Sequence, residues 1–332
     1  MYSIWITWED HRRSRELAEA LGCRYVYLRY ERSGILRYVI LLCRTTILVI
    51  RNKPTTVFCQ NPSIILAAWL SLLRGPFGFT LVVDRHTNFN FGTEDSRNPK
   101  WLLFHFLSRF SLKHSDLTIV TNKPLARLVE KLGGRATVLQ DKLPKIRTGA
   151  ILKLNGRINF LFICTFSDDE PVHEVLTAFS RFPKDIFVYV TGKYHKFSEW
   201  KRFSGEANII FLGFLREDDY QQYLGSCDAT IVLTTQPMTL NCGSYESVVA
   251  GKPQIVANSE VIMDYFDAGA VYSGLTQKGI EVAIQTLIDN QDDLKTSVEL
   301  LKRKLELDWR SRFERLVFEL ETLGTKRYNQ SV

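Results

Sequence analysis

The sequence predicts an α/β protein made of two consecutive Rossmann-like halves. Strand-like and helix-like segments alternate over residues 4–139, and the same rhythm starts again at residue 158. Alternation of this kind with short turns is typical of a parallel sheet covered by helices. Between the two runs, proline and glycine interrupt a stretch without hydrophobic periodicity, which indicates a connection between domains. The length of 332 residues suits two domains of about 150 residues each.

The elements of the first half follow from apolar, β-branched runs that end in turn residues. The predicted strands are residues 4–8, 25–28, 56–60, 79–83, 117–121 and 136–139. The predicted helices are residues 14–21, 63–73, 101–113 and 124–132, with a long apolar segment at 35–50. We expect the helix at 63–73 to close at Gly75-Pro76, because glycine and proline are typical of helix ends.

The second half repeats the pattern. The predicted strands are residues 158–164, 186–191, 209–211, 229–234 and 254–257. The predicted helices are residues 172–181, 218–226 and 244–250, and residues 279–323 are mostly helical and charged. We place domains at residues 1–148 and 158–302, a linker at 149–157 and a final helix at 303–332. One apolar stripe at helical spacing marks that last helix: Trp309, Phe313, Leu316 and Val317.

Composition and charge exclude several classes of protein. A content of 45% hydrophobic and 24% charged residues fits a globular chain and argues against a disordered, collagen-like or disulfide-stapled one. No apolar run reaches the roughly 20 residues of a spanning helix. The net charge of +7 is unevenly divided, because residues 1–155 carry +13 and the others −6. The first half is expected to meet an anionic partner, the candidates being a membrane surface, a phosphorylated acceptor or nucleic acid.

Several motifs that define other sites are absent. No G-x-G-x-x-G follows a strand and no G-x-x-x-x-G-K-[ST] occurs, which argues against a dinucleotide site and a P-loop. Without H-E-x-x-H, a histidine cluster or D-x-D, we expect no metal and no cofactor. Six scattered cysteines without a C-x-x-C pair, and no visible secretory signal, predict a reducing, cytoplasmic location.

The most informative stretch is residues 241–253, where Gly243 and Ser244 open a predicted helix. A helix start offers N–H groups and the positive end of the helix dipole, which suit a diphosphate. Glu246 lies in the first turn, where a carboxylate can accept hydrogen bonds from two ribose hydroxyls. The alternative is an ordinary N-capped helix with an acidic first turn.

Two further loops of the second half carry polar residues at strand ends. Thr165 and Ser167 lie between the first strand and helix of this half, where they would face a ligand crevice. Lys193 also follows a strand, and there it would neutralise a leaving phosphate, a role that a metal fills elsewhere. Each of these residues, taken alone, is equally consistent with a solvated turn.

The first half offers candidate bases and an anionic binding surface. Asp84 and His86 follow a predicted strand and suit general base catalysis, the alternative being a structural histidine. Arg12 and Arg13 at a helix start suit an anionic headgroup, unless they are a solvated charge run. Residues 30–53 interleave apolar side chains with arginines, which suits an anionic membrane interface. The alternative there is a buried helix whose arginines reach outward.

Together these stretches resemble glycosyltransferases of the GT-B type. The order of short motifs along residues 2–325 is similar to that of the β-1,4-mannosyltransferases acting on chitobiosyl-diphosphodolichol and their bacterial exopolysaccharide relatives. The similar segments are Gln60-Asn61-Pro62, Asp84-Arg85-His86, Val120-Thr121-Asn122, Asp141-Lys142 with Pro144, Thr165 to Glu170, Val190 to Lys193, and Leu224 to Asp228. One departure is Met238, where many retaining members carry the first Glu of an E-x7-E pattern ending at Glu246. The acidic loop after the strand at 158–164 is another, since those members carry an Arg/Lys pair there.

The resemblance implies two Rossmann-like domains that face each other across a cleft. It also implies that the last helix packs back on the first domain. It implies an inverting, metal-independent transfer from a GDP- or UDP-sugar to a lipid-diphosphate-linked glycan, at the inner face of the plasma membrane. The expected catalytic residues are Asp84 and His86, with Glu94 and Asp95 in reserve. The expected donor-binding residues are Thr165, Ser167, Lys193, Phe214, Leu215, Asn241, Gly243, Ser244, Tyr245 and Glu246. The expected acceptor-binding residues are Glu9, His11, Arg12, Arg13, Asn61 and Glu94.

Other functions stay open at this point. A retaining transferase on the same fold is one, and a non-catalytic nucleotide-sugar-binding subunit of a polysaccharide assembly is another. A nucleic-acid binder ranks last, because few aromatic and basic residues alternate in the way that base stacking needs. GDP-mannose follows from the resemblance alone, and UDP-glucose, UDP-N-acetylglucosamine and UDP-glucuronic acid are further candidates.

Overall fold

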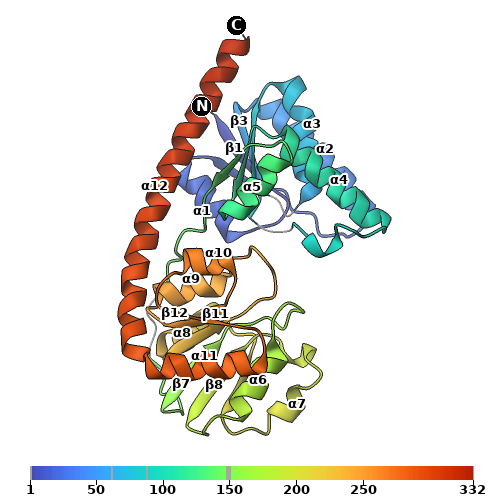
Figure 1. Ribbon diagram of the computed structural model, residues 1–332. Coiled ribbons are helices and arrows are strands. Elements are labelled where there is room, and N and C mark those ends of the chain that lie inside the picture. The colour runs from blue at the N-terminus through green and yellow to red at the C-terminus, as the bar shows by residue number, and fades with distance from the viewer. Residues whose placement is uncertain (1, 61–62, 87–88, 147–150, 332) are drawn as a thin grey trace. The chain divides into compact units, whose positions relative to one another are not determined.

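The chain forms two compact units, each built on one parallel sheet (Figure 1). The computed structural model describes residues 2–60, 63–86, 89–146 and 151–331. Unit 1 comprises Met1–Lys142 together with Asp308–Val332, and unit 2 comprises Leu143–Leu307. In the part of the chain that is described, no helix is both long enough and apolar enough to cross a membrane.

Unit 1 has a six-stranded sheet with the order β2-β1-β3-β4-β5-β6, and all its neighbouring strands are parallel. The strands are β1 (Ser3–Thr7), β2 (Arg24–Tyr27), β3 (Thr56–Gln60), β4 (Thr80–Asp84), β5 (Leu117–Val120) and β6 (Ala136–Val138). The helices are α1 (Arg12–Ala20), α2 (Ile35–Asn52), α3 (Ile64–Phe77), α4 (Pro99–His114) and α5 (Lys123–Lys131), with the 3-10 turn η1 (Phe91–Thr93). The strand order reverses between β1 and β3, because β1 pairs with both β2 and β3.

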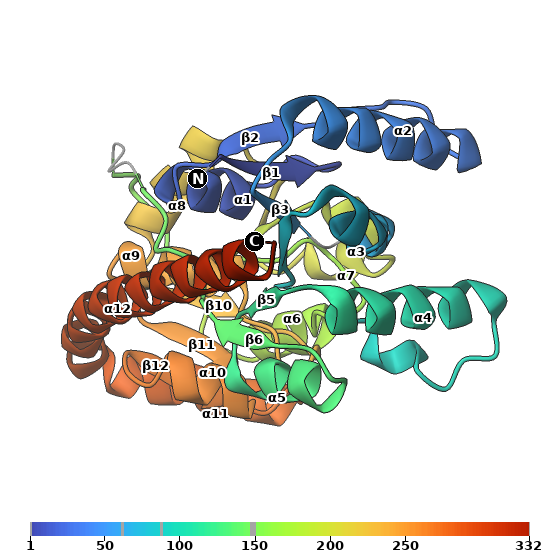
Figure 2. The same ribbon diagram turned by 90° about the horizontal axis from the view of Figure 1, so that it is seen from above.

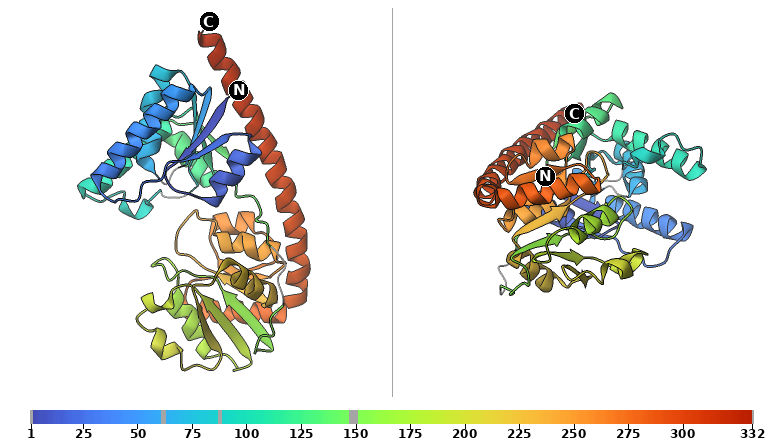
Figure 3. Two further views of the ribbon diagram at one scale, coloured as in Figure 1. Left: turned by 180° about the vertical axis from the view of Figure 1, so that it is seen from behind. Right: turned by 60° about the horizontal axis from the view of Figure 1, so that its bottom comes forward.

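The two faces of this sheet are covered by different helices (Figure 2). On one face, α2 and α3 bury apolar side chains such as Leu41 and Leu66 against Ile4 and Ile6 of β1. On the other face, α1 packs on the sheet together with the C-terminal part of α12 (Gln291–Ser331), which contributes Trp309 and Leu316. Figure 3 shows α12 as one unbroken helix.

The end of α3 differs from the sequence expectation. We expected the helix to close at Gly75-Pro76, but it continues through both residues to Phe77. Gly78 supplies the actual stop, because it adopts a left-handed conformation (φ 69°) and its N–H donates to the carbonyls of Arg74 and Gly75.

Unit 2 has a second parallel sheet, with the order β12-β11-β10-β7-β8-β9. The strands are β7 (Ile158–Phe162), β8 (Ile186–Thr191), β9 (Ile209–Gly213), β10 (Ala229–Val232), β11 (Gln254–Ala257) and β12 (Ala270–Ser273). The helices are α6 (Val172–Ser180), α7 (Trp200–Phe203), α8 (Glu217–Ser226), α9 (Cys242–Val249), α10 (Glu260–Tyr265), α11 (Gln277–Asp289) and the start of α12, with the 3-10 turn η2 (Tyr194–Lys196). Here the order reverses between β7 and β10.

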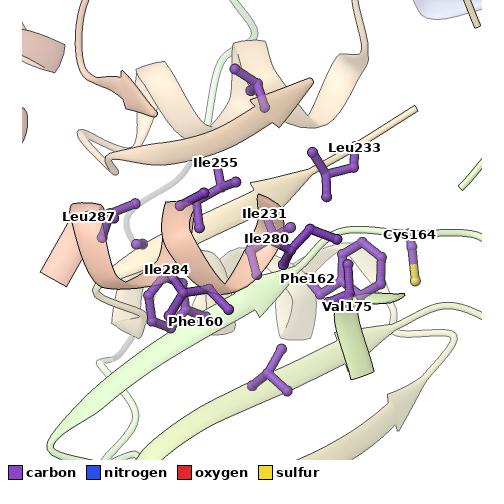
Figure 4. Packing of buried hydrophobic residues seen from close by; sticks show 14 of the residues in the cluster. Phe160, Phe162, Cys164, Val175, Ile231, Leu233, Ile255, Ile280, Ile284 and Leu287 are labelled. Carbon is purple, nitrogen blue, oxygen red and sulfur yellow. The ribbon is translucent and has the colours of Figure 1, made fainter. Parts of the chain in front are cut away.

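The core of unit 2 explains why its central strands are almost wholly apolar. Phe160 and Phe162 of β7 pack with Ile231 of β10 against Ile280 and Ile284 of α11 (Figure 4). Strands of a parallel sheet are buried on both faces, so they carry continuous apolar runs. The opposite face is covered by α8 through a smaller cluster around Leu224. This packing fixes the strand ends that surround the site described next.

Candidate functional site

A pocket of about 490 Å³ opens at the carboxyl ends of the central strands of unit 2. Ile163 and Cys164 follow β7, Thr191 ends β8 and Val232 ends β10, and all four line the pocket. The pocket therefore lies where the strand order reverses, the position at which open parallel sheets bind ligands. Its polar lining comes from Thr165, Glu170, Lys193, Lys196, Glu217, Tyr220, Asn241 and Glu246.

The start of α9 forms one wall of this pocket. Asn241 and Gly243 both line it, and they belong to the N-terminal end of the helix. A Cβ atom on Gly243 would lie 3.0 Å from Ile163 Cγ2 and 3.3 Å from Val232 Cγ2. The missing side chain therefore lets the helix start approach the strand ends closely. The positive end of the helix dipole consequently borders the pocket, where it favours an anionic ligand.

A carboxylate on α9 is held in place by a tyrosine of α8. The Tyr220 hydroxyl donates a hydrogen bond of 2.6 Å to Glu246 Oε2, and both side chains line the pocket. Burial and the neighbouring carboxylate raise the pKa of Tyr220 well above its usual range. The phenol therefore keeps its proton and remains a donor, which fixes the carboxylate at the pocket wall.

The loop after β7 uses its amides internally. The backbone N–H groups of Thr165 and Ser167 each donate to Glu170 Oε2 at 2.9 Å. Phe166 between them adopts a left-handed conformation (φ 59°), which turns both amides toward one point. A diphosphate would have to compete with Glu170 for these donors, so the loop is not an open anion site. The Ser167 hydroxyl is itself bonded to the Asp169 carboxylate.

The loop after β8 brings cations to the pocket. Gly192 has a φ of 96°, and a Cβ there would lie 2.4 Å from the Cys164 carbonyl oxygen, so only glycine fits this turn. Lys193 follows directly, with its Nζ 5.7 Å from the centre of the Phe214 ring. Lys196 lines the pocket as well. Two ammonium groups therefore provide positive charge for a phosphate at this end of the pocket.

In unit 1, the end of β4 carries a buried ion pair. Arg13 donates to both oxygens of Asp84 at 2.9–3.1 Å, and its Nη1 lies 2.6 Å from Asp141 Oδ1. Only 3% of the Arg13 side chain and 1% of the Asp84 side chain are exposed. Burial alone would raise the pKa of Asp84, but Arg13 and His86 hold it well below its usual range. Asp84 is therefore ionised, and its carboxylate oxygens are bonded by Arg13 and His86.

The same carboxylate orients His86. Nδ1 of His86 lies 3.2 Å from Asp84 Oδ2. An ionised carboxylate only accepts hydrogen bonds, so Nδ1 of His86 is the donor in this contact, and the other ring nitrogen, Nε2, is not part of it. The centres of the His11 and His86 rings are 5.0 Å apart. Burial and, to a smaller extent, the nearby His86 lower the pKa of His11.

The other expected acceptor residues differ in how far they are exposed. Arg13 differs most from the expectation, because its guanidinium is buried between two carboxylates and offers no surface to a headgroup. Arg12 is partly exposed, with Nε 3.9 Å from a Glu16 oxygen. Glu9 and Glu94 are exposed, and Asn61 lies outside the described residues.

Comparison with known proteins identifies the fold. No protein-family model and no curated sequence matches this chain. Among solved structures, it is similar to a sucrose-phosphate synthase of Thermosynechococcus elongatus (TM-score 0.79, 9% identity, 98% of this chain and 100% of that one). It is similar to HepE of Anabaena in complex with UDP and glucose (0.72, 12%, 97% and 100%). It is also similar to WaaB, a lipopolysaccharide outer core galactosyltransferase (0.66, 12%, 96% and 99%).

The chain has the GT-B fold. Within its unit 2, the GT-B chain brings seven of the expected donor residues to one pocket: Thr165, Lys193, Phe214, Leu215, Asn241, Gly243 and Glu246. Ser167 is exposed on its loop, whereas Ser244 and Tyr245 are buried. The Tyr245 ring packs in the core against Tyr265 and Phe266.

Sequence reasoning about this GT-B chain missed several polar residues of the pocket. Glu170, Lys196 and Tyr220 all line the pocket. Lys196 carried a weak signal, since it lies three residues after Lys193 in the same loop. Tyr220 carried none, because its partner Glu246 is 26 residues away along the chain.

Proposed function

We propose that this chain is a glycosyltransferase that moves a sugar from a nucleotide-diphosphate sugar to a lipid-diphosphate-linked saccharide. The observation that carries the proposal is the unit 2 pocket, where a helix start, two lysines and a fixed carboxylate converge. Phosphate, ribose and base are the parts of a nucleotide that such a set recognises. The structures of HepE with UDP and glucose, and with UDP-glucose, support it, since they share this fold.

The donor would use the pocket as follows. Its diphosphate would meet the start of α9 at Gly243 together with Lys193 and Lys196, and its ribose hydroxyls would donate to Glu246. Its base would lie near Phe214, which is 79% exposed and available for stacking. In this assignment the lysines stabilise the negative charge that develops on the departing diphosphate. Either UDP or GDP suits these contacts.

The chemistry on unit 1 would depend on His86. Its Nε2 would take the proton of the acceptor hydroxyl as the oxygen attacks C1 of the sugar from the side opposite the diphosphate. The C1–O bond to the diphosphate breaks as the new glycosidic bond forms, so the anomeric configuration inverts. Asp84 would hold the tautomer and orientation of His86. Met238, in place of the first Glu of E-x7-E, is consistent with this inverting course.

A membrane-bound acceptor agrees with the charge of unit 1. The three helices α2, α3 and α4 together carry seven Arg and Lys residues and no Asp or Glu. Several of their apolar side chains are exposed, among them Ile35, Val39 and Phe106. Basic, partly apolar helices of this kind bind anionic bilayer surfaces. We propose that unit 1 docks there, at the cytoplasmic face of the membrane, where lipid-linked saccharides are found.

A transfer assay tests this function. The full chain is incubated with a panel of UDP- and GDP-sugars and a lipid-diphosphate-linked saccharide, with and without EDTA, and the product anomer is read by NMR. The proposal expects transfer with one donor, unaffected by EDTA and with inversion at C1. Retention at C1 would favour a retaining transferase on the same fold. Binding of a nucleotide sugar without any turnover would favour a non-catalytic subunit.

A further inference from the structure

Unit 1 has a pocket of its own at the point where its strand order reverses. Glu9 follows β1, Ser63 follows β3 and Asn90 follows β4, and all three line a pocket of about 420 Å³. This is the same topological position, between β1 and β3, at which open parallel sheets bind ligands. His86 also follows β4, so the pocket belongs to the edge of the sheet that carries the candidate base.

The lining of this pocket combines positive charge with an apolar surface. Arg37 of α2 and Lys100 of α4 supply two cations. Ile64 of α3 and Phe104 and Leu107 of α4 supply apolar groups. Glu9 is the carboxylate in the described lining, and it follows the same strand as His11. A ligand for such a surface needs an anionic group joined to a hydrocarbon chain.

Exposed apolar side chains continue outward from the pocket on the same helices. On α4, Leu103 lines the pocket and is 58% exposed, and Phe106 is 65% exposed. On α2, Ile35 and Leu36 are 84% and 56% exposed. Helix α3 contacts both α2 and α4 (Figure 2), so these side chains belong to one group of packed helices. Exposed apolar side chains grouped on packed helices mark a site that something apolar covers.

We propose that the unit 1 pocket, defined by Arg37, Lys100, Leu103, Phe104 and Leu107, binds the lipid diphosphate of the acceptor. The phosphates contact Arg37 and Lys100, and the first part of the hydrocarbon chain contacts the apolar residues of α3 and α4. The chain then leaves along the exposed side chains of α4 toward the bilayer. Glu9, which follows β1, then contacts hydroxyl groups of the saccharide. This assignment rests on the proposed function, whose acceptor class it locates.

Farnesyl diphosphate tests the pocket, because it is water-soluble and carries both groups. Its binding to the full chain is measured by calorimetry without any nucleotide, beside inorganic pyrophosphate and farnesol. We expect farnesyl diphosphate to bind at least about tenfold more tightly than either fragment, since it alone makes both kinds of contact. Equal affinity for pyrophosphate would show a simple phosphate site and overturn the proposal, and so would no binding of farnesyl diphosphate.

Two pairs of variants on α4 locate the binding. Lys100→Gln and Leu103→Ser alter pocket residues, whereas Lys113→Gln and Leu102→Ser alter a lysine and a 55% exposed leucine of the same helix outside the pocket lining. We expect each pocket variant to weaken binding about tenfold, the size of one lost charged or apolar contact, and the control variants to leave it within about twofold. Equal losses in both pairs would mean adsorption to the helix surface and would contradict the proposal.

Two further measurements separate the possible failures. Anionic phospholipid vesicles are added to the farnesyl diphosphate titration. If the vesicles displace farnesyl diphosphate at an equal concentration of headgroups, the pocket binds membrane headgroups and the proposal fails. If sugar transfer occurs but farnesyl diphosphate does not bind, the pocket assignment fails and the proposed function stands. If farnesyl diphosphate binds with the expected variant pattern but no nucleotide sugar binds, the proposed function fails and the lipid site stands.

Discussion

The strand ends of the two units use their charged residues in opposite ways. In unit 1, the Asp84 carboxylate is buried and bonded by Arg13, which also binds Asp141, so these charges are used within the protein. In unit 2, Lys193 after β8 and Glu246 of α9 line an open pocket, where the Tyr220 hydroxyl donates a hydrogen bond to Glu246. A charged residue at a strand end is therefore not by itself a ligand site. What differs between the two units is whether the charged side chain is buried in an ion pair or lines an open pocket.

The largest expected effect concerns His86, the proposed base beside the unit 1 ion pair. His86→Gln should lower kcat by about 10²- to 10⁴-fold, because a positioned general base contributes that much. The affinity for the nucleotide sugar should not change, since the donor site lies in unit 2. Steady-state kinetics and calorimetry together check this, with His105→Gln as a control in the same unit. Near-normal turnover of the His86 variant would remove the base from the mechanism.

The second effect concerns the ion pair itself. Arg13→Met should lower the free energy of unfolding by about 3–5 kcal/mol, because it leaves Asp84 buried with its charge unpaired. Arg12→Met, at an exposed neighbouring position, should change it by less than about 0.5 kcal/mol. Urea unfolding followed by circular dichroism measures both variants. If both variants change the free energy of unfolding equally, Arg13 is not held in a buried ion pair with Asp84.

The same variant has a characteristic pH dependence. The folded-state pKa of Asp84 is lowered, so the stability from its pairing is present above the unfolded-state pKa of about 4 and is lost as the pH falls through the folded value. The deficit of Arg13→Met should therefore shrink when unfolding is measured near pH 3 instead of pH 7, because a neutral Asp84 needs no cation. A deficit that grows in acid would contradict this sign.

A smaller effect is expected at the open carboxylate of unit 2. Glu246→Gln should weaken the binding of the preferred nucleoside diphosphate by about 10- to 100-fold, the worth of hydrogen bonds to a charged group. A 2′-deoxy nucleotide should lose less, because it lacks one of the two hydroxyls. Glu217→Gln, in the same pocket, is the matched control. If both variants weaken the binding of the ribonucleotide and of the 2′-deoxy nucleotide equally, the negative charge of the pocket matters and ribose recognition does not.

The smallest effect concerns the tyrosine that holds this carboxylate. Tyr220→Phe removes one hydrogen bond of 2.6 Å and keeps the ring. It should cost about 1 kcal/mol of nucleotide affinity, about fivefold. A double-mutant cycle with Glu246→Gln should show that the two losses do not add, because Tyr220 acts through Glu246. Strict additivity would assign Tyr220 a separate contact with the nucleotide.

The fold was largely predictable because buried parallel strands leave an unmistakable pattern. Residues 80–84 and 158–162 are apolar runs bounded by turn residues, and both are central strands. Sequence analysis missed α7, α10 and β12 of unit 2. All three are short, and β12 is mostly half-buried at the sheet edge, so none carries enough apolar residues for a periodicity to show.

The site was predictable only as a set of positions at strand ends and at one helix start. Lys193 was found because it follows a strand, and Gly243 and Glu246 because a helix start suits a diphosphate and a carboxylate in its first turn suits a ribose. The partners were not predictable, because they come from distant parts of the chain. Arg13 and Asp84 are 71 residues apart, and no local pattern joins them. Glu170 is near Thr165 in sequence, but the return of its carboxylate to the amides depends on the left-handed turn at Phe166.

The binding of a nucleoside diphosphate in unit 2 is the claim on which the account depends most. We would measure the Tm of the full chain with UDP, GDP and ADP, with and without EDTA, for the native sequence and for Glu246→Gln. The account predicts that one nucleoside diphosphate selectively raises the Tm of the native chain, that EDTA leaves this rise unchanged, and that Glu246→Gln largely removes it. No rise with any nucleoside diphosphate would contradict the account.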